Sequence, residues 1–182
     1  MRYDLPTSVE VNGKEYTVRS DYRDILNIIE ALSDNELTDS DKAEVMLDIF
    51  YPDFIEIPAS DYEEAIKKCM WFISCGDNQK DDKKKPKLMD WQQDFPLIVA
   101  PINRVIGKEI RSIDYLHWWT LIAAYQEIGD CTFAQVVAIR NKKAKGKKLE
   151  KAEQEFYKQN RNLVDFKRQY TEQDENVINK WI

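Results

Sequence analysis

The sequence predicts a mainly α-helical fold, a compact bundle of about six or seven helices with a short N-terminal β-hairpin. Apolar residues recur at helical spacing in successive segments from residue 22 onward, which is the pattern of amphipathic helices. The dipeptide Asn12-Gly13 stands between two short alternating segments near the start. With 182 residues, 43% of them hydrophobic, the chain can bury one core. We expect a domain over residues 1–146 and a C-terminal helix and tail over residues 147–182.

The hairpin is expected over residues 8–18. Apolar and polar residues alternate on both sides of Asn12-Gly13, and this dipeptide suits the two positive φ angles of a type I′ turn. A two-stranded hairpin is marginal in water by itself. Its apolar face therefore needs a helical surface to pack against.

Two amphipathic helices are expected next. The first begins after Ser20 or Asp21 as its cap. The second begins near Thr38 or Ser40 and ends before Pro52, whose ring disfavours a helical residue in front of it.

A third helix is predicted from a capping box of Ser60 with Glu63, and Gly76 has the position of a left-handed C-terminal cap. Residues 77–87 that follow are polar and rich in lysine. Because they have no apolar residue to bury, we expect a flexible charged loop.

A fourth helix should begin at Asp90, capped with Gln93, and end at Gly107. Pro96 and Pro101 fall inside it. Each proline removes one backbone hydrogen bond, so a kinked or broken helix is expected rather than a straight one.

The fifth helix is expected to open at Ser112 or Asp114 and to stop at Gly129, as the central core helix. A sixth should begin near Asp130 or Thr132.

Near the C-terminus the sequence becomes strongly basic from Arg140 to Lys151. Gly146 within this stretch is expected to break the helical structure. A half-exposed seventh helix is expected from about Lys147 to Gln169. An apolar stripe then ends the sequence and consists of Val177, Ile178, Trp181 and Ile182.

The residues that could carry chemistry are few. His117 is the one histidine, and we expect it at the core or its boundary, hydrogen-bonded to the backbone. The cysteines form no C-x-x-C pair and are expected to be small buried residues rather than ligands or disulfides; they are Cys69, Cys75 and Cys131. No phosphate-binding, nucleophile-elbow or metal motif occurs. We therefore expect no enzyme activity, no cofactor and no metal.

Charge is unevenly distributed along the sequence. Residues 1–68 hold 17 acidic and 7 basic side chains, whereas residues 69–182 hold 16 acidic and 20 basic ones. The opposite net charges favour either attraction within one fold or head-to-tail association between copies. The basic stretch lacks interleaved aromatic residues, so nucleic acid is not an expected partner. Apolar runs are too short for a membrane span of about 20 residues, and no secretory segment begins the chain.

Four segments together resemble the bacteriophage Gp15 family. Residues 5–16 are similar to its opening pattern L-P-x-x-V-x-V-x-G-x-x-Y, Tyr22-Arg23 enters the first helix, and residues 71–76 read WFISCG. The most specific segment is residues 113–119, IDYLHWW, which contains Asp114, Tyr115, His117, Trp118 and Trp119. Such an aromatic cluster is first expected to anchor a core. The resemblance covers residues 1 to about 168; Pro96, Pro101 and the tail depart from it.

The resemblance implies a tail assembly chaperone. Such a protein is non-catalytic, binds the phage tape-measure protein, and keeps it soluble in the host bacterial cytoplasm without entering the mature virion. A homo-oligomer and a second tail chaperone are further candidate partners. Candidate partner-binding residues are the apolar stripe (Val177, Ile178, Trp181, Ile182) and the lysines of the basic stretch (Lys142, Lys143, Lys145, Lys147, Lys148). The stripe could instead fold back on its own core.

An alternative function comes from the acidic N-terminal half. A phage-encoded inhibitor of a host defence or replication protein could use such a surface against a basic channel built for nucleic acid. Strong salt dependence of binding would favour this interpretation, whereas binding to long apolar helices would favour the chaperone.

Overall fold

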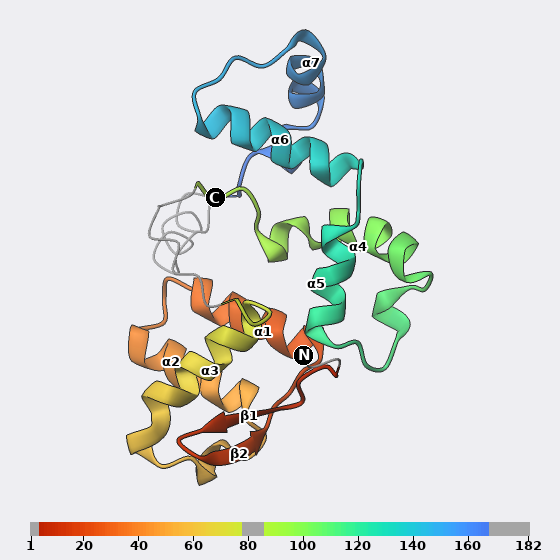
Figure 1. Ribbon diagram of the computed structural model, residues 1–182. Helices are drawn as coiled ribbons and strands as arrows, with labels where there is room; N and C mark the ends of the chain where they lie inside the picture. The colour runs from red at the N-terminus through yellow and green to blue at the C-terminus, as the bar shows by residue number, and fades with distance from the viewer. Residues whose placement is uncertain (1–3, 78–85, 168–182) are drawn as a thin grey trace, which may run out of the picture. The chain divides into compact units, whose positions relative to one another are not determined.

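The computed structural model describes residues 4–77 and 86–167, and it confirms a mainly α-helical fold with one N-terminal hairpin (Figure 1). In chain order the elements are β1 (Ser8–Val11), β2 (Lys14–Thr17), α1 (Tyr22–Ser33), α2 (Asp39–Phe50), α3 (Tyr62–Ile73), α4 (Trp91–Ile106), α5 (Trp118–Gln126), α6 (Thr132–Ala144), α7 (Lys151–Gln159) and α8 (Arg161–Val164). Three single-turn 3₁₀ helices are η1 (Phe54–Glu56), η2 (Ala59–Asp61) and η3 (Ile110–Ser112).

The described residues form two compact units. The first contains residues 4–77 and 98–129, and the second contains residues 86–97 and 130–167. The boundary passes through α4 after Leu97.

The hairpin is confirmed, with β1 and β2 antiparallel and Val9 opposite Tyr16. Asn12 and Gly13 have φ angles of 46° and 88°, as a type I′ turn requires. Val9, Val11 and Tyr16 are buried, and β1 packs against α3. The marginal hairpin is thus stabilised by a helix.

The core of the first unit lies among α1, α2 and α3. The Phe50 ring contacts those of Tyr51 and Phe72 with centroids 4.8 and 5.2 Å apart. Tyr51 donates its hydroxyl to the carbonyl of Ala65, so the polar end of this buried ring is satisfied. The other fully buried side chains here include Ile25, Ile28, Leu47 and Cys69.

The predicted caps of the first two helices are confirmed. Asp21 accepts the backbone N–H of Arg23 at the start of α1. Thr38 and Asp41 form a capping box at the start of α2, and these hydrogen bonds from Thr38 lower the pKa of the Asp41 carboxyl.

The predicted capping box at Ser60 is wrong. Ser60 lies inside η2, where its hydroxyl donates to Asp61, so α3 begins two residues later at Tyr62. At the other end of α3, Gly76 has the expected positive φ of 84°, and Cys75 before it has a φ of 56°.

Helix α4 is continuous through Pro96 and Pro101 rather than broken. Asp90 accepts the N–H of Gln93 at 2.9 Å, as expected of the cap. The reciprocal bond comes from Asp94, whose carboxylate accepts the N–H of Asp90. The partner in the cap is therefore Asp94 and not the side chain of Gln93.

Two later helix boundaries also differ from expectation. Helix α5 begins at Trp118, not at Ser112 or Asp114, because His117 supplies its N-cap. Helix α7 begins at Lys151 after a capping box of Glu150 with Glu153. It ends at Gln159, and the short α8 follows. The prediction of one long helix from about Lys147 to Gln169 is therefore wrong.

In the second unit, Val136, Ile139 and Val164 form the buried centre. Half-buried side chains from α4, α7, α8 and the loop before α7 pack around them, namely Leu97, Leu149, Phe156, Tyr157 and Leu163. In the described parts of the chain, no helix is long and apolar enough to cross a membrane.

Candidate partner-binding surfaces and the residues that hold them

His117 is buried and serves as a helix cap. Its Nδ1 accepts the backbone N–H of Trp119 at 3.0 Å, which leaves Nε2 to carry the proton and donate to the carbonyl of Pro6 at 2.9 Å. The ring also lies 5.5 Å from that of Phe72. The expectation of a histidine bonded to backbone is confirmed, and both ring nitrogens are used in holding the fold.

The two tryptophans after His117 bind the end of α3. The Trp118 indole N–H donates to the carbonyl of Ile73 at 2.9 Å, and that of Trp119 donates to the carbonyl of Phe72 at 2.8 Å. Carbonyls in the last turn of a helix have no partner within the helix. The segments WFISCG and IDYLHWW thus meet in one contact, in which the indoles cap α3.

Gly76 completes this contact. A Cβ at this position would lie 3.3 Å from the Trp119 ring, and the φ of 84° is one that side chains rarely adopt. Trp71 packs edge-on against Trp119 with centroids 5.5 Å apart.

The start of α1 holds the same aromatic segment from its other side. Asp21 accepts the backbone N–H of Leu116 at 2.8 Å. Arg23 donates to the carbonyls of Ile113 and Ile110 at 2.5 and 3.3 Å. Asp21 and His117 form an isolated antiparallel bridge. These contacts explain physically why Tyr22-Arg23 and IDYLHWW occur together.

Not all of the aromatic segment belongs to the core. Trp118 is 2% exposed, but Tyr115 is 52% exposed and Asp114 is exposed as well. Both precede the helix instead of lying on its inner face. The Tyr115 hydroxyl lies 2.7 Å from that of Ser20.

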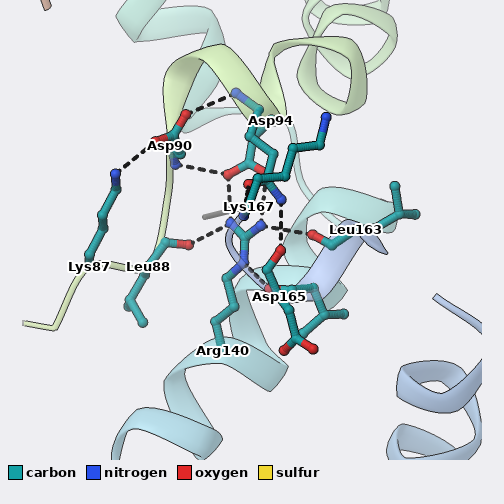
Figure 2. A network of polar contacts seen from close by, with 10 residues as sticks. Lys87, Leu88, Asp90, Asp94, Arg140, Leu163, Asp165 and Lys167 are labelled. Atoms are coloured by element: carbon teal, nitrogen blue, oxygen red, sulfur yellow. Dashed lines mark hydrogen bonds and ion pairs between the residues drawn. The ribbon is translucent and has the colours of Figure 1, made fainter. Parts of the chain in front are cut away.

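A buried ion pair of Arg140 with Asp94 holds the second unit (Figure 2). The guanidinium makes two hydrogen bonds to the carboxylate, of 2.6 and 2.9 Å. The two side chains are 3% and 0% exposed. This bidentate geometry is the one that makes arginine effective with carboxylates.

The remaining donors of Arg140 bind backbone carbonyls from separate segments. They reach Leu88 before α4 and Leu163 and Val164 in α8, at 2.7 to 3.1 Å. The Phe166 ring stacks on the guanidinium with its centroid 4.1 Å away. One side chain thus fixes the start of α4, α6 and the last described segment together.

In the sequence Arg140 was counted only as the first residue of the basic stretch, and its burial and its pairing with Asp94 were not predicted. The sequence did contain a sign that Arg140 is buried. It follows Val136 by four residues and Phe133 by seven, which places it on the buried face of α6. A charge at this spacing, with an acidic residue at a helix start elsewhere, indicates a buried pair.

Two of the predicted partner-binding lysines have ion partners within the protein. Lys142 lies 2.6 Å from Glu153, and this hydrogen bond raises the pKa of Lys142. Lys143 pairs with Asp165 and donates to the Tyr157 hydroxyl. These lysines connect α6 to α7 and the segment after α8.

The other three lysines form what we call the basic turn, Lys145 to Lys148. Gly146 has a φ of 63°, and Lys147 donates its backbone N–H to the carbonyl of Lys142. This is a Schellman motif, which gives the turn a defined shape. Lys145, Lys147 and Lys148 are exposed, and no ion pair joins them to another described residue.

An acidic surface that the sequence analysis did not single out lies on the first unit. We call it the α2 face: Asp41, Glu44, Val45, Asp48 and Phe54 line a hollow of about 260 Å³. Ile55, the residue after Phe54, is 96% exposed. In the sequence, the α2 face is indicated by acidic residues at positions 41, 44 and 48, a spacing that places them on one side of a helix.

A larger hollow, of about 750 Å³, lies between the hairpin and α3. Its lysines are paired locally, because Lys67 lies 2.7 Å from Glu63 and Lys68 lies 3.5 Å from Glu64. Its two lysines are therefore already engaged in ion pairs along α3.

The cysteines and carboxylates do not assemble into a metal centre within the described residues. Burial raises the pKa of the Cys69 thiol, and burial raises that of Cys75 to about 11. Cys69 is buried and Cys75 and Cys131 are half-buried. The apolar stripe (Val177, Ile178, Trp181, Ile182) and most of the predicted loop 77–87 lie outside the described residues.

Comparison with known proteins gives one match. The family model described as "Bacteriophage Gp15 protein" matches residues 1–166. The searches of curated proteins and of solved structures returned no match. The matched region includes the hairpin, the aromatic segment and the Arg140 network.

Replacing Arg140 by Met should lower the free energy of unfolding by about 3–5 kcal/mol, because it leaves the Asp94 carboxylate buried without its counter-charge. Chemical denaturation followed by circular dichroism measures this. Lys142→Met is the matched control on the same helix and should cost about 1 kcal/mol or less. Equal effects of the two variants would contradict the importance given to the buried pair.

Replacing His117 by Ala should cost about 2 kcal/mol of unfolding free energy, since both the cap and the bond to Pro6 are lost. His117→Asn should retain part of it, because the asparagine oxygen can still accept the Trp119 N–H. Thermal unfolding of the wild type, His117→Ala and His117→Asn gives the order of their stabilities. An Asn variant as unstable as the Ala variant would show that capping is not what His117 provides.

Proposed function

This chain belongs to the bacteriophage Gp15 family, and on that premise we propose that it is a tail assembly chaperone. In this proposal it binds the phage tape-measure protein and keeps it soluble in the host cytoplasm during tail morphogenesis. It does so without catalysis and is absent from the mature virion. The proposal rests on family membership.

The α2 face supports a binding role through its mixed character. Val45 and Phe54 line it together with three carboxylates, and Ile55, the residue after Phe54, is exposed. Amphipathic helices bind grooves through apolar anchors at helical spacing. Such a surface fits a partner that presents basic residues beside apolar ones.

The apolar stripe at residues 177–182 is a second proposed contact. Val177, Ile178, Trp181 and Ile182 have the spacing of anchors for a groove in the tape measure or in another copy. Deleting residues 176–182 tests this contact. If partner binding and oligomeric state did not change, the proposed role of the stripe would be contradicted.

The alternative is a phage inhibitor of a host nucleic-acid-binding protein. The observation that favours it is the exposed row of Asp41, Glu44 and Asp48 on α2. The Arg19 guanidinium lies at one end of this row, where it donates to the backbone carbonyls of Asp48 and Ile49. A row of carboxylates can occupy a channel built for phosphates.

Co-expression with the tape-measure protein of the same phage tests the chaperone role. We expect a soluble complex with many copies of this chain per tape measure, measured by light scattering after affinity purification of one partner. The tape measure expressed alone is the control and should be insoluble. A monomer of this chain beside an insoluble tape measure would contradict the proposal and favour the host-directed inhibitor.

A further inference from the structure

We propose that copies of this protein associate head to tail, with the basic turn of one copy seated on the α2 face of the next. The inference goes beyond the chaperone role and does not depend on it. It names both surfaces and commits to a second copy of this chain as the occupant.

The α2 face has the properties of an unoccupied docking surface. Ile55, which follows Phe54 in the chain, is 96% exposed, so it offers apolar surface that a partner can bury. Asp41, Glu44 and Asp48 surround that hollow. Residues 39–56 contain six acidic side chains and one basic one, Lys42. Lys14 pairs with Glu56, and the Arg19 guanidinium binds the carbonyls of Asp48 and Ile49. The surface still has a net negative charge, which attracts basic partners.

The basic turn has the complementary properties. Residues 140–151 contain seven basic side chains against Glu150 alone. Arg140, Lys142 and Lys143 are used within the fold. Lys145, Lys147 and Lys148 remain exposed on a turn whose shape the Schellman motif fixes. Little conformational entropy of the backbone is therefore lost when this turn binds.

The two surfaces match in size and chemistry. Asp41 and Asp48 are seven residues apart on α2, so the row spans about 10 Å, which three neighbouring lysines can cover. Each lysine stem is apolar and can lie over Val45, Phe54 or Ile55 while its ammonium reaches a carboxylate. One contact thereby buries the apolar surface and neutralises the acidic row.

Every copy carries both surfaces, one in each unit. A contact between two different surfaces leaves one of each free at the ends, so it repeats into a chain or closes into a ring. Association should therefore increase with protein concentration and decrease with salt.

The test uses the full-length protein alone, without a tape measure, in sedimentation velocity over a range of concentrations and salt. We expect species larger than a monomer at about 50 mM salt that dissociate at about 500 mM. Glu44→Lys with Asp48→Lys, and separately Lys147→Glu with Lys148→Glu, should each weaken association by roughly tenfold or more. Asp41 is kept because it caps α2.

Mixing the two charge-reversed variants is the decisive step. Each repels itself, but every contact between unlike copies pairs opposite charges again, so the equimolar mixture should associate as the wild type does. Glu127→Lys with Asp130→Lys is the matched control; both residues are exposed, and their reversal should leave association unchanged. Ile55→Ser, which changes no charge, should weaken association and identifies the apolar part of the contact.

A wild-type protein that stays monomeric at all concentrations and at low salt would overturn the proposal. So would reversed variants that associate like the wild type, or a mixture that fails to associate although each variant is folded by circular dichroism. Failure of co-expression with the tape measure would contradict the chaperone role but not this contact, because the two experiments share no partner.

Discussion

The buried guanidinium of Arg140 is the constraint on which the second unit, residues 86–97 and 130–167, depends; we call it the C-terminal unit, and the first unit the N-terminal unit. A buried charge is tolerated only when a counter-charge and hydrogen bonds compensate its lost hydration. Asp94 supplies the counter-charge, and carbonyls from before α4 and from α8 accept the remaining donors. Segments far apart in the sequence must therefore converge on one side chain, although the hydrophobic centre around Val136 is small.

In the N-terminal unit, neutral side chains act together with Asp21 and Arg23 in binding backbone groups. His117 and the indoles of Trp118 and Trp119 bind backbone groups at helix ends and at Pro6. The family segment IDYLHWW is thus understood as a structural connection rather than a reactive site. These polar side chains are hydrogen-bonded within the two units. A partner can therefore bind only exposed charged side chains and a few exposed apolar ones.

Local signals in the sequence were enough to predict the hairpin, the caps at Asp21 and Thr38, and the left-handed end of α3. These features depend on neighbours within four residues. Tertiary contacts account for what was missed or wrong. The burial of Arg140 was not predicted because its partner Asp94 is 46 residues away. The start of α5 was placed too early because it depends on the cap that His117 provides. The α2 face was missed because its hollow needs Phe54, which lies beyond the end of the helix.

The central claim is that Arg140 holds the C-terminal unit together while the N-terminal unit is held by its own contacts. Hydrogen exchange followed by mass spectrometry, on the wild type and on Arg140→Met, tests it directly. The account predicts that amides in α6, α7 and α8 lose protection in the variant, whereas those in β1, β2 and α1 to α3 keep it. Unchanged protection in α6 to α8, or an equal loss in α1 to α3, would contradict it.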